Sequence, residues 1–147
     1  MEIAVLACGC FWGPEIKFGK LEGIYRTEVG YCGGNSSKTS YEEDCTGTTN
    51  HAEVVKLEFD PNKISYEKIL EFFFQIHDPT TLNSQGPDFG TQYRSEIFYL
   101  NDNQKNIAEK ITKKINEKLS GKVVTKISLL KNYYLAEEYH QKYLDKN

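Results

Sequence analysis

Residues 3–15 read IAVLACGCFWGPE. The first five of these residues form a short apolar run, which is typical of a buried strand. A glycine and two bulky aromatic residues follow, and the proline and glutamate at the end suit the first turn of a helix. The sequence therefore predicts a strand over Ile3–Ala7, a turn that carries Cys10, and a helix that begins near Pro14 and is closed by Gly23.

The rest of the chain continues with strand-like and helix-like patterns. Further strands are predicted over Ile24–Tyr31, Glu53–Phe59, Ile97–Leu100 and Val123–Leu129, and further helices after Ser65, after Asp102 as far as Gly121, and over Ala136–Leu144. In the second strand, one face is shared by Tyr25, Thr27, Val29 and Tyr31. This order favours an α+β fold, a two-layer sandwich in which helices pack on a mainly antiparallel mixed sheet, as in split βαβ (ferredoxin-like) folds.

Length and composition restrict the class of protein. The chain has 147 residues, of which 39% are hydrophobic and 27% charged, so we expect a single domain over residues 1–147 with a core of its own. The net charge of −3 gives no basic field for nucleic acid or anionic lipid. Because no apolar stretch has the length of a membrane span or the form of a signal peptide, we expect a cytoplasmic protein.

Two segments are too long and too polar for economical connections. Residues 30–51 and 78–95 are rich in Gly, Asn, Ser and Thr. Loops of this length in a small domain are usually functional or disordered. The aromatic and acidic residues within them favour a functional role.

The four cysteines all lie in the first third of the chain, at Cys8, Cys10, Cys32 and Cys45. Such clustering favours reactive or metal-binding thiols over a disulfide scaffold. Cys10 lies where a strand ends and a helix begins, and there the helix dipole and unpaired N–H groups stabilise a thiolate. The alternative is an inert buried cysteine.

A metal site is the less favoured use of these thiols. The spacing of the cysteines does not match a zinc signature, and no histidine lies at ligand spacing from them. A site made of Cys8, Cys10, Cys45 and His51 remains an alternative. We expect no metal and no organic cofactor.

Glu53 is the acidic residue with the clearest pattern. By strand parity it shares the face of Val55, Leu57 and Phe59, which should be buried. Burial disfavours the charged form of a carboxyl, so Glu53 is expected to hold a proton near neutral pH and to donate it to a developing oxyanion. The alternative is an exposed residue at a frayed strand end.

The aromatic residues near the cysteine are candidates for substrate contacts. Phe11 and Trp12 could frame an apolar pocket beside the thiolate, or fill the core. Tyr31 and Tyr93 lie in or beside the long loops, and their hydroxyls can hydrogen-bond a polarised oxygen. Polar loop residues near Tyr93, such as Arg94, are expected to face solvent or form turns.

Several motifs together resemble the A-type peptide methionine sulfoxide reductases (MsrA). They are GCFWG-x-E at 9–15, GY-x-GG at 30–34, YEE at 41–43, CTGTT at 45–49, HAEVV at 51–55, HDPT at 77–80, QG-x-D-x-GTQYRS at 85–95 and AE-x-YHQ-x-YL at 136–144. They occur in order and cover nearly the whole chain.

The resemblance implies a reaction and a role for each motif residue. Cys10 would attack the sulfur of methionine-S-sulfoxide, free or in a peptide, and would leave the reaction as a sulfenic acid. Phe11 and Trp12 would bind the methyl group, and Glu53 would protonate the oxygen. Tyr31, Asp88 and Tyr93 would hold that oxygen or the water around it. The resemblance implies no metal or cofactor.

The chain departs from this family at its C-terminal end. Many relatives have resolving cysteines in a Gly-rich tail, whereas no cysteine follows Cys45 here. Cys32, Cys45 or Cys8 could resolve the sulfenic acid, but we favour attack by an external thiol such as glutathione, glutaredoxin or thioredoxin. Some members carry selenocysteine at the nucleophile position, where this sequence has Cys10.

Two other classes of function compete with the reductase. The clustered cysteines could belong to a thiol or metal-binding protein without catalysis. The chain could also be a module that binds oxidised methionine in peptides but lacks activity. The presence of both Cys10 and Glu53 argues against the second alternative.

Overall fold

The computed structural model describes residues 1–33, 51–85, 88–90, 93–131, 133–137 and 140–141. Most of the predicted loop over residues 30–51, including Cys45, lies outside these ranges. The strands are β1 (Glu2–Cys8), β2 (Ile24–Cys32), β3 (Ala52–Phe59), β4 (Ser84–Gln85), β5 (Asp88–Phe89), β6 (Ser95–Tyr99), β7 (Lys126–Leu129) and β8 (Tyr134–Leu135). The helices are α1 (Trp12–Gly19), α3 (Tyr66–Gln75) and α4 (Asp102–Lys118).

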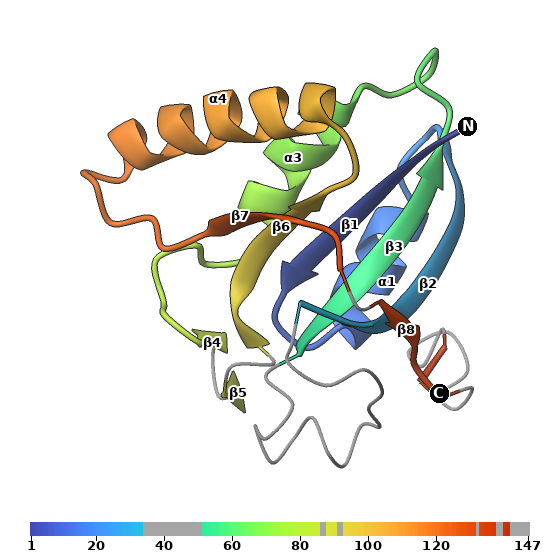
Figure 1. Cartoon of the computed structure of the whole chain (residues 1–147), viewed down its shortest axis with the longest axis horizontal. Helices are drawn as coiled ribbons and strands as arrows, with labels where there is room; N and C mark the ends of the chain where they lie inside the picture. The colour runs from blue at the N-terminus through green and yellow to red at the C-terminus, as the bar shows by residue number, and fades with distance from the viewer. Residues whose placement is uncertain (34–50, 86–87, 91–92, 132, 138–139, 142–147) are drawn as a thin grey trace.

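Six of the strands form one sheet in the order β7-β6-β1-β3-β2-β8 (Figure 1). The pairs β1–β3, β1–β6, β2–β3 and β2–β8 are antiparallel, whereas β6–β7 is parallel. Strands β4 and β5 form a separate two-stranded sheet. The predicted α+β fold with a mainly antiparallel mixed sheet is therefore confirmed.

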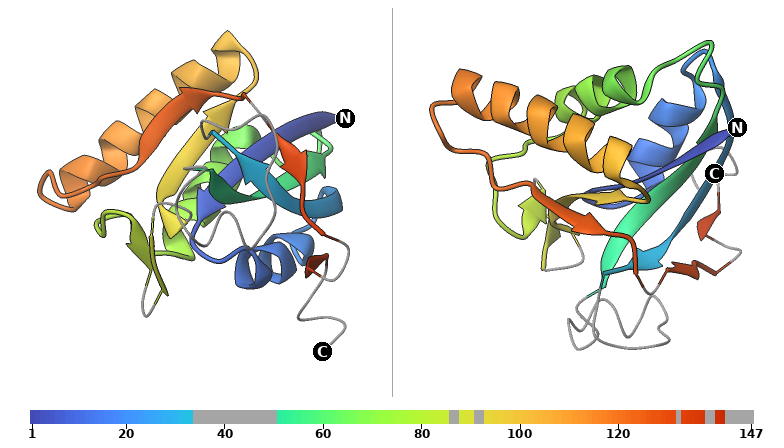
Figure 2. Two further views of the ribbon diagram at one scale, coloured as in Figure 1. Left: turned by 60° about the horizontal axis from the view of Figure 1, so that its bottom comes forward. Right: turned by 45° about the horizontal axis from the view of Figure 1, so that its top comes forward.

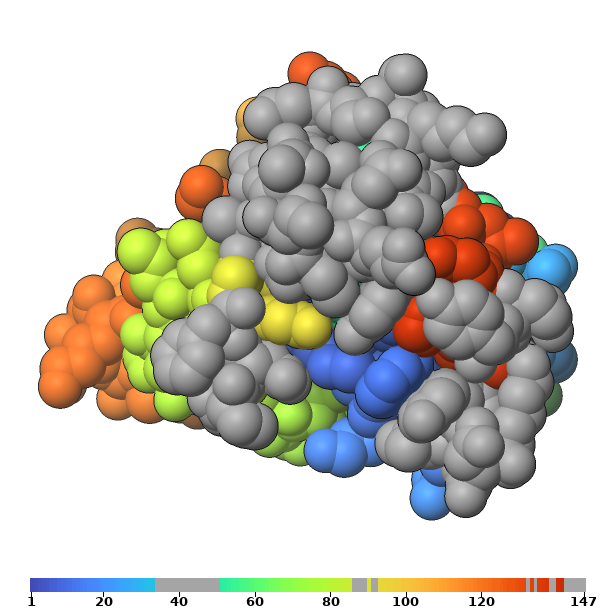
Figure 3. Space-filling model, turned by 90° about the horizontal axis from the view of Figure 1, so that it is seen from below, coloured from blue at the N-terminus to red at the C-terminus, as the bar shows by residue number. Residues whose placement is uncertain are grey.

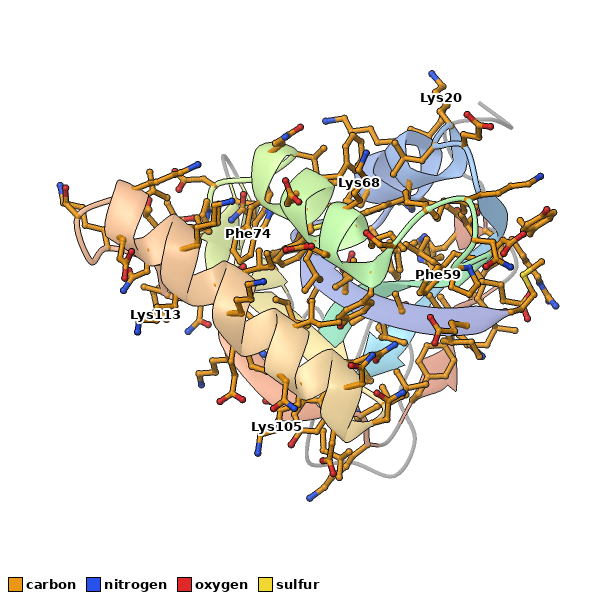
Figure 4. The ribbon with its side chains drawn as sticks, turned by 90° about the horizontal axis from the view of Figure 1, so that it is seen from above. Lys20, Phe59, Lys68, Phe74, Lys105 and Lys113 are labelled. Carbon is orange, nitrogen blue, oxygen red and sulfur yellow. The ribbon has the colours of Figure 1, made fainter. Side chains whose placement is uncertain are left out.

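The described helices cover one face of this sheet. Figure 4 looks onto that layer, where Lys105 and Lys113 extend from the exposed side of α4. The main core lies beneath, between helix residues such as Phe18 and Phe73 and strand residues such as Leu57. The opposite face carries a smaller apolar cluster of Val5, Ala7, Cys32, Ala52, Val54 and Phe98, against which Leu130 and Tyr133 pack. Two further views show how the sheet separates these layers (Figure 2).

The helix ends follow local chemistry. The Ser65 side chain accepts a hydrogen bond from the Lys68 amide, as predicted. The long helix α4 is capped by Asn101 and not by Asp102, because the Asn101 side chain accepts from the Gln104 amide. Gly121 follows this helix with φ of 77°, as expected for a glycine that ends a helix.

Three predictions about elements are wrong. Tyr25 is 54% exposed because the register shifts between Ile24 and Arg26, so a bulge breaks the alternation. Gly23 does not close α1, which ends at Gly19 with Lys20 as its C-cap. The described residues of the predicted helix over Ala136–Leu144 are not α-helical, and the chain before them pairs with β2 as β8.

The described helices include no segment with the length and apolar character needed to cross a membrane.

Candidate active site

The turn between β1 and α1 exposes the second cysteine of the chain. Gly9 has φ of +96°, a conformation that residues with a side chain rarely adopt, and a Cβ there would lie 2.8 Å from Cγ of Gln85. The turn places Cys10 at the start of α1, half-buried, before the N-cap residue Phe11. The positive end of the helix dipole favours a thiolate at this position.

Glu53 lies directly behind this turn. Its side chain is fully buried, so the alternative of an exposed strand end is wrong. Oε1 of Glu53 accepts a hydrogen bond of 3.2 Å from the backbone N–H of Phe11, the residue that follows Cys10. The acid predicted from strand parity is therefore held against the backbone of the turn that carries the thiol.

Aromatic rings surround this meeting point. Phe11 packs at 5.7 Å from Tyr31, which is fully buried and lies opposite Glu53 across the β2–β3 pair. Trp12 packs beside them at the start of α1. We call Phe11, Trp12, Tyr31 and His140 the aromatic cluster. Phe11 is 1% exposed and belongs with Trp12 to a small apolar cluster that is separate from the main core.

The C-terminal segment supplies polar partners that sequence reasoning missed. The Trp12 Nε1–H donates to Nδ1 of His140 at 3.0 Å, and the Tyr31 hydroxyl donates to Oε1 of Glu137 at 3.0 Å. The sequence indicates no role for His140, because its spacing from the cysteines does not match a zinc signature. Only the motif over 136–144 pointed to this segment, and it did so without assigning roles.

The last two predicted residues lie in the segment around β5. Asp88 pairs by its backbone with Gln85, the residue that contacts Gly9, but its side chain is outside the described part of the structure. Tyr93 is half-buried, and its backbone N–H donates to the Gly90 carbonyl. Figure 3 looks onto this end of the molecule, where the β1–α1 turn (blue) reaches the surface beside residues 78–85 (yellow-green).

Arg94 does not face solvent as predicted. It is 8% exposed, and its Nε lies 2.6 Å from Oε1 of Glu96. The second carboxylate oxygen of Glu96 accepts from Ser128 at 2.5 Å. Because the two charges are paired and hydrogen-bonded, they tolerate burial, and they link β6 to β7 on the face opposite the helices.

The other two described cysteines differ from Cys10. Cys8 is 6% exposed, and burial raises the pKa of its thiol to about 12. Cys32 is the last residue of β2 rather than a loop residue, and it is fully buried. Burial and, to a lesser extent, the Glu96 carboxylate raise its pKa well above the ordinary value. None of the three forms a disulfide.

The alternative metal site receives no support from the described residues, among which no three His, Cys, Asp or Glu side chains are grouped to hold an ion. Cys45, which that alternative needs, lies outside the described ranges. His51 is fully buried in the strand region.

A helix-terminal thiol next to a buried carboxyl and an aromatic cluster is the arrangement of an enzyme with a nucleophilic cysteine. The family model described as "Peptide methionine sulfoxide reductase" matches residues 2–147. The MsrA protein of Pelagibacter ubique (strain HTCC1062) is 77% identical over 146 residues, which are 99% of this chain and 99% of that protein. The chain belongs to the peptide methionine sulfoxide reductase family.

Solved structures agree with this assignment. The reduced form of Mxr1 from Saccharomyces cerevisiae aligns with a TM-score of 0.95 and 45% identity, over 99% of this chain and 85% of that one. Mxr1 in complex with Trx2 aligns with a TM-score of 0.69 and 30% identity, over 97% of this chain and 84% of that one.

Proposed function

We propose that this chain reduces methionine-S-sulfoxide, free or in peptides, to methionine, with Cys10 as the nucleophile and Glu53 as the proton donor. The observation that carries the assignment is the hydrogen bond from the Phe11 amide to Glu53, because it joins the buried acid to the turn that presents the thiol. Family membership supplies the reaction.

The first step combines attack and protonation. A sulfoxide sulfur becomes a good electrophile only when its oxygen is protonated or strongly hydrogen-bonded. The Cys10 thiolate attacks this sulfur while the Glu53 carboxyl gives its proton to the oxygen, a step for which burial favours the protonated form. The Sγ–S bond formed by this attack and the S–O bond then both break as the hydroxyl passes to Sγ of Cys10. This leaves a sulfenic acid on Cys10 and releases the substrate as methionine.

The aromatic residues orient the substrate. Phe11 and Trp12 contact the methyl group, which suits their apolar rings and their place next to Cys10. The role of Tyr31 as a partner of the sulfoxide oxygen rests on the family resemblance, since its hydroxyl donates to Glu137 in the structure. The roles of Asp88 and Tyr93 as partners of that oxygen rest on the family resemblance.

An external thiol then regenerates the enzyme. It attacks the Cys10 sulfenic acid to form a mixed disulfide and water, and a second thiol releases Cys10 as a reduced thiol. Burial and raised pKa values make Cys8 and Cys32 poor resolving groups. The complex of Mxr1 with Trx2 supports thioredoxin as the reductant, with glutathione or glutaredoxin as alternatives. Unpaired thiols at Cys8 and Cys32 support a reducing compartment such as the cytoplasm.

The function is tested by methionine release from each sulfoxide epimer with dithiothreitol as reductant. We expect activity on the S epimer only, and its loss in Cys10→Ser, because an alcohol at this position is a far weaker nucleophile than a thiolate. Activity in Cys10→Ser comparable to wild type would remove Cys10 from the reaction.

The acid has its own test and a matched control on the same strand. Glu53→Gln should lower the rate of the reductive step by about 10²–10⁴-fold, the range for a general acid, while alkylation of Cys10 continues. Glu58→Gln changes a half-buried carboxyl on the other face of β3 and should leave the rate unchanged. Near-normal turnover in Glu53→Gln would exclude Glu53 as the proton donor.

Regeneration is tested by the mass of the protein after one turnover without reductant. An external route predicts a gain of one oxygen on Cys10. A loss of two hydrogens would instead show an internal disulfide, and peptide mapping would then show whether Cys45 is the partner.

A further inference from the structure

Residues 136 and 141 are hydrogen-bonded to the outer edge of β2. The Ala136 amide donates to the Val29 carbonyl at 3.0 Å. The Gln141 side chain accepts from the Val29 amide at 3.0 Å and donates to the Val29 carbonyl at 2.9 Å. It also donates to the Ala136 carbonyl, so it joins both ends of the segment to one residue of the sheet.

This attachment places His140 against the residues that follow Cys10. The His140 ring lies 5.6 Å from the Trp12 ring and 5.3 Å from the Phe11 ring. The side chain is 1% exposed. His140 is therefore the residue through which the C-terminal segment packs against Phe11 and Trp12 in the aromatic cluster.

The hydrogen bond with Trp12 fixes the state of the imidazole. The indole N–H can only donate, so Nδ1 of His140 must accept and cannot carry a proton. Burial lowers the pKa of His140 and favours the same neutral state, although the nearby Glu137 carboxylate acts in the opposite direction. An imidazolium would have donors at both nitrogens and would lose the bond to Trp12.

We propose that His140 is a positioning residue, which in its neutral form holds the Trp12 indole in the orientation that binds the methyl group of the substrate. This inference rests on the proposed function, since it assigns the methyl contact to Trp12. It predicts that acid weakens substrate binding by releasing Trp12, an effect on KM that is separate from any effect of acid on the Cys10 thiolate. The titratable group that acts on this ring is Glu137 on the same segment, while Tyr31 on β2 packs against Phe11, the other neighbour of the ring.

Trp12 is the only tryptophan in the chain, so tryptophan fluorescence reports the surroundings of this residue alone. The test compares wild type with two variants. His140→Phe keeps an aromatic ring but removes the acceptor, whereas His140→Asn keeps an acceptor atom near the position of Nδ1. We measure quenching of Trp12 by acrylamide from pH 4.5 to 8, together with kcat and KM for methionine sulfoxide.

In wild type, acrylamide quenching and KM should both rise as pH falls through a midpoint below the ordinary histidine value of 6.5. In His140→Phe, acrylamide should quench Trp12 at every pH as strongly as it does in wild type in acid. KM should be about 5–10-fold higher than in wild type, the effect of one lost hydrogen bond. Its kcat should stay within about 3-fold of wild type, an effect below one hydrogen bond. His140→Asn should behave like wild type at neutral pH, but without the acid transition.

Three results would overturn the proposal. They are quenching in His140→Phe equal to wild type, an acid transition of Trp12 that persists in His140→Asn, and a loss of kcat without change in KM. If wild type itself does not reduce methionine sulfoxide, the proposed function fails. The acrylamide quenching of Trp12 in wild type and the two variants still decides whether His140 holds Trp12. If His140→Phe does not fold, wild type and His140→Asn decide the question by their pH dependence.

Discussion

Two neighbouring cysteines, Cys8 at the end of β1 and Cys10 in the turn that follows, lie in different surroundings. Cys8 belongs to the main apolar core, and its pKa is raised to about 12. Cys10 is half-buried at the N-terminal end of α1, with the Glu53 carboxyl bound to the next amide. The residue type is the same, so the difference in expected reactivity comes from the fold. Gly9, with its positive φ, separates the two environments.

The largest expected contrast is in alkylation rate. At neutral pH, a pKa of about 12 in place of 9.0 lowers the thiolate fraction of Cys8 by about a thousandfold, and its burial slows the reaction further. Iodoacetamide labelling of the native protein, followed by peptide mass spectrometry, should therefore modify Cys10 at least about a thousand times faster than Cys8. In guanidinium chloride the two rates should become similar. Equal rates in the native protein would show that the environments do not differ as described.

The second contrast concerns the surroundings of Cys8, the buried cysteine, and their effect on how stability depends on pH. The His77 imidazole contacts the Phe73 carbonyl at 2.6 Å and the hydroxyl of Ser95 at 2.7 Å, and Ser95 lies opposite Cys8 in the β1–β6 register. Burial lowers the pKa of His77 to about 4 from its ordinary value of 6.5. Between these values the unfolded chain binds more protons than the folded chain, so stability falls as pH falls.

The expected loss between pH 7 and pH 4 is roughly 3 kcal/mol from His77 alone. Denaturant melts over this range should show it, and His77→Asn should flatten the pH dependence even if it lowers stability overall. Labelling of Cys8, after correction for the roughly tenfold loss of thiolate per pH unit, should increase in parallel as the structure beneath it opens more often. A slope that His77→Asn leaves unchanged would assign the acid effect to other groups.

A smaller effect is expected at the residue between the two cysteines. Gly9→Ala forces a side chain into a positive φ and into contact with Gln85, which should cost about 1–3 kcal/mol of stability. It should also lower activity, because the turn carries Cys10. Gly13→Ala is the matched control, since a Cβ at Gly13 meets nothing within 4 Å. If Gly9→Ala had the same stability and activity as Gly13→Ala, the conformation of Gly9 would not be what separates the surroundings of Cys8 and Cys10.

The smallest effect should come from Cys8 itself. Cys8→Ala removes one buried sulfur atom from the core and should lower stability by about 1 kcal/mol. Turnover with dithiothreitol should stay unchanged, because Cys8 has no part in the proposed reaction. Loss of turnover in a folded Cys8→Ala protein would bring Cys8 back as a functional thiol.

Much of the arrangement could be predicted where the signal is local. The two-residue period of a strand was enough to bury Glu53 on the face of Val55 and Leu57, as the structure shows. The strand–turn–helix pattern around Cys10 placed the thiol at a helix start. The burial of Glu53 and the position of Cys10 depend on residues that are close in sequence, so both can be predicted from the local pattern.

Other features depend on contacts across the chain and could not be predicted in this way. The spacing of residues over 136–144 fits a helix, but the Val29 backbone on β2 competes for its hydrogen bonds. His140 binds Trp12 across 128 residues, and nothing near His140 indicates that partner. Arg94 pairs with Glu96 two residues away, but its second contact, the Gly33 carbonyl, and the Ser128 hydroxyl that binds Glu96 come from distant parts of the chain.

The place of β1 in the sheet has a consequence for the order in which the molecule opens. β1 pairs with β3 on one side and β6 on the other, whereas β8 lies at the edge and pairs with β2 at only two positions, Gly30 and Tyr31. Backbone amides of a central strand exchange with solvent last, and those of a short edge strand exchange early. The reactive sulfur therefore follows the most slowly exchanging part of the chain. The residues that contact Trp12 follow β8, a short edge strand that should open more readily than β1. The contact with Trp12 should therefore open locally while Cys10 keeps its position.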